Sequence, residues 1–373
     1  MEGYDQDWVY AGARRFASYT NLDPGEYLFR VKACNNDGIW NDQGTSLRII
    51  ITPPFYKTKW FYTLVILLII GLIYAYIRFR EKQLVRENVI LEEKVAIRTR
   101  QIAEINKEIS KKNQDITDSI NYARRIQQAI LVPEQEIRQS LKGLFLFYKP
   151  KDIVSGDFYW FQRLQDQQSG QESYLLAVAD CTGHGVPGAF MSMIGIDLLN
   201  DLVKRTQDPG RILEYLNRAV KEALRQSDQA DHTRDGMDIA LCLIRAQAGG
   251  GVTLLFAGAN RPMWIVPRGQ TVPIEIKSTK AAIGGFTEEN QVFNTEEISV
   301  STGDSVYFFT DGYLDQFGGE HSKKFMVKRF RQLVGSIAHK SPSAQVEGLH
   351  IAFEQWKQKE EQVDDILVMG FVV

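Results

Sequence analysis

The stretch ADCTGHGVPGAFMS, at residues 179–192, joins an apolar run to a glycine-rich loop. The preceding residues, YLLAVA, are typical of a buried strand, and the apolar pattern that follows predicts a helix at 187–205. Asp180 therefore stands at the end of a strand, where its carboxylate can project from the edge of a sheet. An isolated aspartate beside glycine is usually a turn residue, so the interpretation depends on what else the chain places at strand ends.

Three other aspartates also border apolar runs. Asp157 opens one in SGDFYW, Asp311 follows one in FFTDGY, and Asp364 precedes one in VDDILV. Four carboxylates at strand ends can converge on one site. Carboxylates, backbone carbonyls and water are the ligands that Mg²⁺ and Mn²⁺ prefer. Two such ions can share a hydroxide and hold a phosphoryl group for in-line attack.

From residue 144 onward the pattern predicts about nine strands and two pairs of helices. The helices are expected near 187–205, 211–225, 322–335 and 342–357. The strands come in adjacent runs, and neither GxGxxG nor GxxxxGK[ST] opens a helix. This order favours a layered α/β (α+β) sandwich over a doubly wound parallel sheet.

Taken together, GDFYW, ADCTGHGVPGAFMS, TDGYLDQFGG and DDILV resemble the metal-dependent protein phosphatases (PPM family, type 2C), in the bacterial branch related to the stage II sporulation phosphatase. The resemblance covers about residues 143–373. It implies a β-sandwich flanked by helices on both faces, and hydrolysis of phosphoserine or phosphothreonine with two Mn²⁺ or Mg²⁺ ions. It also implies a phosphoprotein substrate of the anti-anti-sigma type.

The same resemblance implies the site residues, among which Asp157, Asp180 and Asp311 would act through a metal-activated water. The metal ligands that it implies are Asp157, Asp180, Asp311, Asp364, Asp365 and the backbone carbonyl of Cys181, at a position that is often glycine. Asp365 is the weaker candidate of the adjacent pair.

His184 is a candidate proton donor, with an alternative interpretation as a residue of the loop that closes over the site. Eukaryotic members of the family place a histidine two residues after the equivalent of Asp180, where this chain has Thr182. Arg261, in GANRP, is a candidate phosphate ligand. Asp238, in GMDIAL, is expected to hold the start of a strand.

Residues 60–77 contain no charge and predict a transmembrane helix. Eighteen residues at 1.5 Å each span roughly 27 Å, close to the hydrocarbon thickness of a bilayer. Aromatic residues stand at both ends, as at membrane interfaces. More basic residues follow the span than precede it, which predicts a single-pass protein of the bacterial inner (cytoplasmic) membrane with its phosphatase domain in the cytoplasm.

Residues 1–54 predict a partial all-β sandwich on the extracytoplasmic side. WVYAG, RFASYTNL, GEYLFRVKACN and SLRIIIT are expected strands separated by turn signals. The segment resembles the Y_Y_Y domain, a fibronectin-like module of bacterial two-component receptors, without its opening strands. The chain is therefore either the C-terminal part of a longer sensor or carries a remnant of that module.

Residues 78–132 lack glycine, proline and histidine and predict a parallel, two-stranded coiled coil that forms a homodimer. The alternative is a single helix packed on the next domain. The expected a positions are Asn88, Val95, Ile102, Ile109, Ile116, Ala123 and Ile130. The expected d positions are Leu84, Leu91, Arg98, Ile105, Lys112, Ser119 and Ile126.

Composition excludes several other classes. The chain has 44 Lys and Arg against 46 Asp and Glu, which gives no excess of positive charge for binding nucleic acid. Its three cysteines include no CxxC pair, which argues against a disulfide scaffold and a structural zinc site. A histidine kinase would need a histidine on the helix after the span. The sequence thus predicts a membrane-bound signalling phosphatase, with a catalytically weak, partner-binding scaffold as the alternative.

Overall fold

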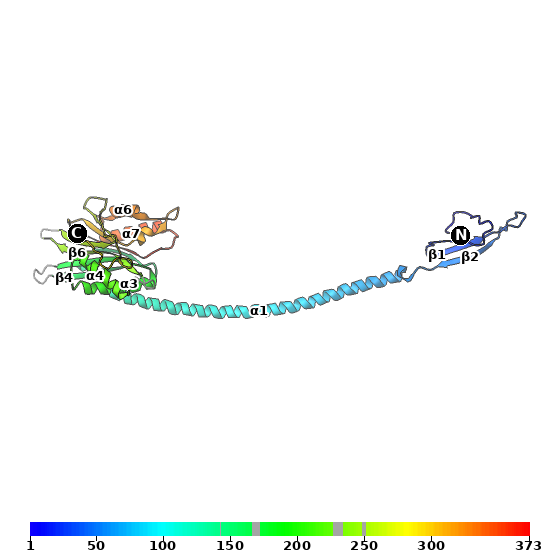
Figure 1. The fold of residues 1–373 in the computed structure, drawn as a ribbon, viewed down its shortest axis with the longest axis horizontal. Helices are drawn as coiled ribbons and strands as arrows, with labels where there is room; N and C mark the ends of the chain where they lie inside the picture. The colour runs from blue at the N-terminus through cyan, green and yellow to red at the C-terminus, as the bar shows by residue number, and fades with distance from the viewer. Residues whose placement is uncertain (142, 166–171, 227–233, 248–250) are drawn as a thin grey trace. The chain divides into compact units, whose positions relative to one another are not determined.

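The computed structural model describes residues 1–141, 143–165, 172–226, 234–247 and 251–373. Its internal contacts divide the chain into two units, Met1–Glu108 and Ile109–Val373. A single long helix, α1 (Lys59–Ile130), begins in the first unit and ends in the second (Figure 1).

The first unit holds one small antiparallel sheet. Its strands are β1 (Gly25–Val31) and β2 (Thr45–Ile51). The prediction of strands at WVYAG and RFASYTNL was wrong, because residues 7–20 have no partner strand with which to form a ladder. Tyr10 and Phe16 accordingly remain exposed. The N-terminal β-structure is a two-stranded sheet, a smaller part of a sandwich than the sequence pattern indicated.

Helix α1 follows a short 3₁₀ turn, η1 (Phe55–Lys57), and includes both the predicted span and nearly all of the predicted coil. By length and composition it is apolar enough to cross a membrane. It ends at Ile130, three residues before Pro133, and Pro133 precedes helix α2 (Glu134–Ser140).

Two antiparallel sheets form the centre of the second unit. The first has the order β11-β7-β6-β5-β4, with β10 paired to β6, and the second has the order β3-β15-β12-β8-β9. The first sheet contains β4 (Phe158–Gln165), β5 (Glu172–Cys181), β6 (Gly236–Ala246), β7 (Val252–Ala259), β10 (Ile283–Gly284) and β11 (Glu296–Val300). The second contains β3 (Phe145–Lys149), β8 (Met263–Val266), β9 (Ile274–Ile276), β12 (Ser305–Phe309) and β15 (Ile366–Val372). A minor hairpin joins β13 (Phe317–Gly318) to β14 (Lys323–Lys324).

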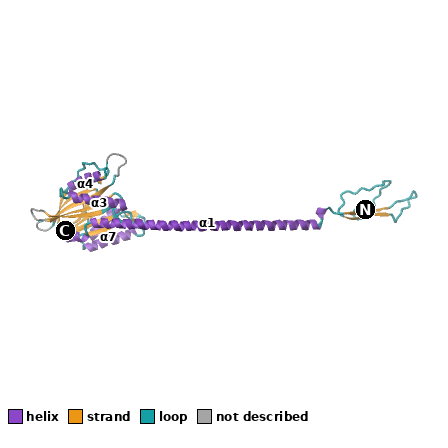
Figure 2. Ribbon diagram, turned by 90° about the horizontal axis from the view of Figure 1, so that it is seen from below, coloured by secondary structure: helices purple, strands orange, loops and turns teal. Residues whose placement is uncertain are grey.

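Two pairs of helices cover the sheets and complete four layers (Figures 1 and 2). Helices α3 (Gly185–Leu202) and α4 (Pro209–Ala223) pack on the first sheet. Helices α6 (Met326–Ile337) and α7 (Pro342–Lys357) cover the second sheet, and the short α5 (Gly312–Asp315) leads toward them. The predicted layered sandwich and its two helix pairs are confirmed.

The alternation of β12 shows why its sequence is a continuous apolar run. Val306 and Phe308 belong to the core between the two sheets. Tyr307 and Phe309 belong to a second core beneath α6 and α7. Successive side chains of a strand point to opposite faces, so a strand buried on both faces needs apolar residues at every position. This double burial holds the ends of β12 in fixed positions.

Candidate metal centre

Antiparallel pairing brings the predicted carboxylates together in twos. In the first sheet, Phe158 at the start of β4 lies opposite Ala179 near the end of β5, so Asp157 and Asp180 stand at the same end. In the second sheet, Phe309 at the end of β12 lies opposite Val368 of β15. Asp311 and the Asp364–Asp365 pair therefore also share one end, because the end of one antiparallel strand lies beside the start of its neighbour.

Contacts across the sandwich show that the two pairs lie at the same end. The Thr310 hydroxyl donates a hydrogen bond of 2.6 Å to Asp157 Oδ2, which joins the second sheet to the first. The Arg261 guanidinium donates to Asp180 at 2.6 Å and to Asp311 at 2.8 Å. Residues separated by more than 150 positions along the chain thus meet in one acidic cluster.

Two glycines permit this close approach. A Cβ at Gly312 would collide with the Asp365 carbonyl oxygen, so only glycine lets the Asp311 turn pass against β15. A Cβ at Gly156 would stand 3.5 Å from the Cys181 carbonyl oxygen and closer still to that of Gly183. The GD and DG dipeptides that sequence analysis singled out are therefore needed for packing of the site as well as for turns.

The cluster is electrostatically strained without added positive charge. Burial, together with the neighbouring Asp180, raises the pKa of Asp157 well above its ordinary value. Burial raises the pKa of Asp180 to about 8, an effect that Asp311 reinforces and Arg261 opposes. Burial acts to raise the pKa of Asp311 as well, but the charge and hydrogen bond of Arg261 hold it below its ordinary value. Closely spaced buried carboxylates ionise together only when a cation compensates them.

Arg261 is the cation that the chain itself supplies. Its guanidinium is largely buried and also lies 3.4 Å from Asp238, which Asn260 holds by a hydrogen bond. Its Nε has no hydrogen-bond partner among the described residues. Within that same part of the chain, no three His, Cys, Asp or Glu side chains are arranged as a ready-made metal site. The guanidinium lies between Asp180 and Asp311 and compensates part of their negative charge.

The donor chemistry nevertheless fits hard divalent cations. The converging groups are carboxylates, and the Cys181 carbonyl oxygen lies beside Gly156 next to them. Burial also raises the pKa of Asp364, which is half-buried. Mg²⁺ and Mn²⁺ favour a group of oxygen ligands whose negative charges lie close together.

Asp365 differs from its neighbour Asp364. It is 2 % exposed, and its two carboxylate oxygens accept hydrogen bonds from the backbone N–H groups of Lys151 and Gly156, each at 2.7 Å. Its carboxylate is thus used to hold the loop before Asp157. Asp364 Oδ1 accepts the N–H of Asp365 at 2.8 Å, and no hydrogen bond to its second oxygen is present among the described residues.

The Cys181 thiol is buried, and burial raises its pKa well above the ordinary value. His184 is half-exposed, and a positive charge on it acts to lower the pKa of Asp364, although its own hydrogen-bond contacts are with two other residues. Its Nδ1 is 2.7 Å from Asp152 Oδ2, and its Nε2 is 3.0 Å from the Lys151 ammonium. The structure therefore brings together the aspartates and Arg261, and it pairs His184 with Asp152 and Lys151 at the rim of this cluster, near Asp364.

Sequence reasoning missed Thr310 and Asp152. Thr310 directly precedes the Asp311-Gly312 turn, so the TDG motif contained a signal for it. Asp152 had none, because its link to His184 spans 32 residues of chain and depends on the fold.

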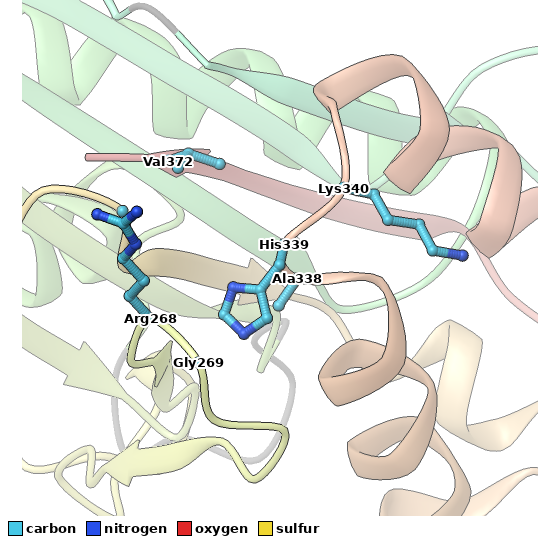
Figure 3. A pocket seen from close by; sticks show the side chains of 7 residues that line it. Arg268, Gly269, Ala338, His339, Lys340 and Val372 are labelled. Carbon is cyan, nitrogen blue, oxygen red and sulfur yellow. The ribbon is translucent and has the colours of Figure 1, made fainter.

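A cavity of about 540 Å³ lies at the other end of the second sheet, where β15 finishes at Val372 (Figure 3). Arg268, His339 and Lys340 line it, and all three are exposed. No carboxylate is among the described residues that line this cavity. It is separate from the acidic cluster.

Two antiparallel sheets between helix pairs, with acidic strand ends, define the class of type 2C protein phosphatases. The SiaA-PP2C domain of Pseudomonas aeruginosa has this fold, with a TM-score of 0.60 and 30 % identity over 70 % of this chain and 98 % of that one. A sequence profile described as stage II sporulation protein E (SpoIIE) matches residues 170–372, more than half of the chain. The chain therefore belongs to the SpoIIE family and carries a PPM-type phosphatase domain.

Other similarities concern parts of longer proteins. A Y_Y_Y domain profile matches residues 1–52, which confirms the predicted N-terminal resemblance. "Histidine kinase P4" of Formosa agariphila is 31 % identical over 41 % of this chain and 11 % of that protein. "Phosphoserine phosphatase RsbP" of Bacillus subtilis is 20 % identical over 52 % of this chain and 45 % of that protein. The chain thus spans less than half the length of these relatives.

Proposed function

We propose that this protein is a membrane-anchored signalling phosphatase that hydrolyses phosphoserine or phosphothreonine on a regulatory protein. The observation that carries the proposal is the convergence of Asp157, Asp180 and Asp311 from three strand ends, with Asp364 on the strand beside Asp311. A scaffold that only binds a partner needs no such cluster, whose burial and mutual repulsion are costly.

The four aspartates and the Cys181 carbonyl would hold two Mn²⁺ or Mg²⁺ ions. When bound, such ions lower the pKa of a coordinated water and neutralise phosphoryl oxygens. The chain's own contribution is to fix the ligands. Thr310 holds Asp157 by its hydrogen bond, and Asp365 holds the loop on which Asp157 stands.

Arg261 is assigned to the phosphoryl group. One nitrogen of its planar guanidinium, Nη2, donates to both carboxylates, and the guanidinium as a whole has the geometry to hold two phosphoryl oxygens. His184 lies on the loop after β5, and Asp152 orients its ring. From there it would hand a proton to the leaving serine oxygen, while Asp152 keeps the proton on Nδ1 in place.

The substrate class is supported by two curated relatives, RsbP and RsbU of Bacillus subtilis, each named a phosphoserine phosphatase. RsbU is 32 % identical over 29 % of this chain. A phosphoserine on a partner-switching regulator of the anti-anti-sigma type is the substrate that we propose.

The membrane and dimer assignments concern helix α1. Residues 60–77 would cross the bilayer and leave residues 1–54 outside the cytoplasm. Beyond the membrane, apolar side chains at a and d positions stay exposed along the single chain, among them Leu91, Ile102 and Ile116. An exposed seam of this period is buried when a second copy pairs with it, which supports a parallel homodimer.

The proposal is tested with the full chain in detergent and a phosphoserine peptide. Mn²⁺ should start release of phosphate, and EDTA should stop it. The Asp180→Asn variant, with matched size and no charge, should release none while showing unchanged circular dichroism. Hydrolysis that persists in EDTA, or equal rates in the folded variant, would refute the assignment.

A further inference from the structure

Arg234 and Phe286 form a stacked pair on the surface of the second unit. The guanidinium carbon of Arg234 lies 4.2 Å from the centre of the Phe286 ring. Phe286 is 81 % exposed, and Arg234 is exposed as well. Among the residues that the structure describes, no carboxylate forms an ion pair with Arg234. The ring therefore holds the plane of the guanidinium, while the N–H groups of Arg234 remain available to a ligand.

The stacked pair lies close to the acidic cluster along β6. Asp238 of this strand lies directly opposite Asp180 of β5. Arg234 stands four residues before Asp238, and four residues span at most about 14 Å. Phe286 follows β10, whose two residues pair with the first two residues of β6. The pair is therefore within reach of a peptide segment that is bound at the acidic cluster.

Hydrogen bonds join the backbone beside Arg234 to the loop that follows β5. The Thr182 hydroxyl donates to Asp235 Oδ1 at 3.1 Å and accepts the Gly236 N–H at 3.0 Å. Thr182 stands two residues after Asp180. The Asp235 carboxylate is thus engaged by this loop, and the position of Arg234 is fixed relative to the carboxylates.

The turn that carries Phe286 is held by side chains of α4 and of the residues after it. Asn217 of α4 is buried, and its Oδ1 accepts the Gly284 N–H at 2.8 Å. Its Nδ2 donates to the Glu288 carbonyl at 2.8 Å. Gln226 Oε1 accepts the next N–H of the turn after that of Gly284, at 2.9 Å. The turn is bonded on both sides of Phe286, so the exposed ring is already in place for binding, which lowers the entropic cost of an interface.

The ligand that suits this pair is an acidic side chain. The N–H groups of a guanidinium held flat on a ring favour a carboxylate, with which they form charge-assisted hydrogen bonds. The Lys221 ammonium donates to the Gly285 carbonyl at 3.2 Å and adds a second positive charge at the same turn. About four extended residues of a bound substrate would span the distance from a phosphoserine at the acidic cluster to Arg234.

We propose that Arg234 is a specificity-determining residue, held in place by Phe286, that binds an acidic side chain of the phosphoprotein substrate about four residues from the phosphoserine. This inference rests on the proposed function, in which phosphoserine is hydrolysed at the acidic cluster. It adds a contact outside the metal-binding residues that selects among phosphoproteins by the charge of the sequence around the phosphoserine.

The test uses the full chain in detergent with saturating Mn²⁺ and two phosphoserine peptides. The peptides are identical except at the positions four residues before and four residues after the phosphoserine, which are both glutamate in one peptide and both glutamine in the other. The ratio of kcat/KM for the two peptides measures docking. We expect the wild type to favour the glutamate peptide about fivefold, the effect of one partly exposed ion pair. This preference should shrink as the salt concentration rises.

Four variants examine the origin of the preference. Arg234→Gln removes the charge and should bring the ratio to about one. Phe286→Leu removes the ring and should lower the ratio, whereas Phe286→Tyr keeps a ring and should preserve it. Arg268→Gln changes an exposed arginine at the other end of the second sheet, so it is the matched control and should keep the wild-type ratio. Circular dichroism checks the folding of each variant, and if Arg234→Gln unfolds, the comparison of the two Phe286 variants decides.

The outcomes separate this inference from the proposed function. Equal kcat/KM for the two peptides in the wild type, or an undiminished preference in folded Arg234→Gln, would overturn the docking role while leaving the metal site intact. Loss of the preference in Arg268→Gln as well would assign it to the overall charge of the chain, which also contradicts the inference. Absence of Mn²⁺-dependent phosphate release from both peptides would overturn the proposed function, and the docking role with it.

Discussion

Strands β12 and β15 have polar groups at both of their ends, but the two ends differ in burial and in charge. At one end, Asp157, Asp180 and Asp311 converge, and Arg261 contacts both Asp180 and Asp311. The pKa values of Asp157 and Asp180 are raised by burial, whereas Arg261 holds the pKa of Asp311 below its ordinary value. At the other end, Arg268 and Lys340 border an open cavity and are exposed to solvent.

This difference in burial and charge indicates which properties mark a functional site in this fold. Residues at the acidic end are held by hydrogen bonds from several loops between strands, at a cost in burial that only a function or a bound cation offsets. The basic end borders a cavity of about 540 Å³, but its charged side chains are exposed to solvent. The two ends are distinguished by the convergence of fixed, buried polar groups at the acidic end.

The largest effect is expected from Asp180→Asn and Asp311→Asn. An amide keeps the size of the side chain but removes the charge that a hard cation needs, so hydrolysis should be abolished. Phosphate release in saturating Mn²⁺ measures this, with circular dichroism as the control for folding. Hydrolysis at the wild-type rate in either variant would show that the acidic end of β12 and β15 is not the catalytic site.

A second change separates the adjacent pair Asp364 and Asp365. Asp365→Asn places an amide against two backbone N–H groups, so it should lower the free energy of unfolding by about 1–3 kcal/mol. Asp364→Asn should leave stability nearly unchanged and weaken Mn²⁺ binding instead. Chemical denaturation measures the stability of the two variants, and calorimetry measures their Mn²⁺ binding. Weaker Mn²⁺ binding in Asp365→Asn, with a stability loss in Asp364→Asn, would show that Asp365 is the ligand.

The pH dependence of stability should reveal the strained carboxylates. Burial raises the pKa of Asp180 to about 8, so the folded chain holds a proton that the unfolded chain has released. The metal-free protein should therefore lose stability as pH rises from about 6 to about 8. Mn²⁺ should stabilise more at the upper pH, because its ligands must be deprotonated. Melting temperatures measured across this pH range, with and without Mn²⁺, test the prediction. In the metal-free Asp180→Asn variant the melting temperature should fall less steeply with pH than in the wild type. An equally steep fall would argue against Asp180 as the cause.

The smallest effect is expected at the basic end. The double change Arg268→Ala and Lys340→Ala removes two exposed charges that no described carboxylate pairs with. Phosphate release from a peptide and Mn²⁺ affinity should both stay within about twofold of wild type. A large loss of peptide hydrolysis would show that this end takes part in catalysis.

Much of the second unit could be predicted from the sequence. Continuous apolar runs such as VYFF mark strands buried on both faces, and the aspartates beside such runs are necessarily at strand ends. The role of Asp365 could not be predicted, since only the fold shows that its oxygens meet the N–H groups of Lys151 and Gly156.

Two other features depend on partners far along the chain. WVYAG and RFASYTNL have strand-like composition, but a strand also needs a neighbour, and local sequence does not supply one. Gln127 occupies a helix position beside the predicted seam, where a polar residue is ordinarily solvated. Its burial follows from Ser155 and Ser192, which lie 28 and 65 residues further along the chain.

Calorimetric titration of the full chain with Mn²⁺ tests the central claim most directly. The account predicts saturable binding of about two ions per chain, with release of protons and loss of at least one site in both Asp180→Asn and Asp311→Asn. Saturable binding that is identical in wild type and in these folded variants, or no binding to the wild type at all, would contradict it.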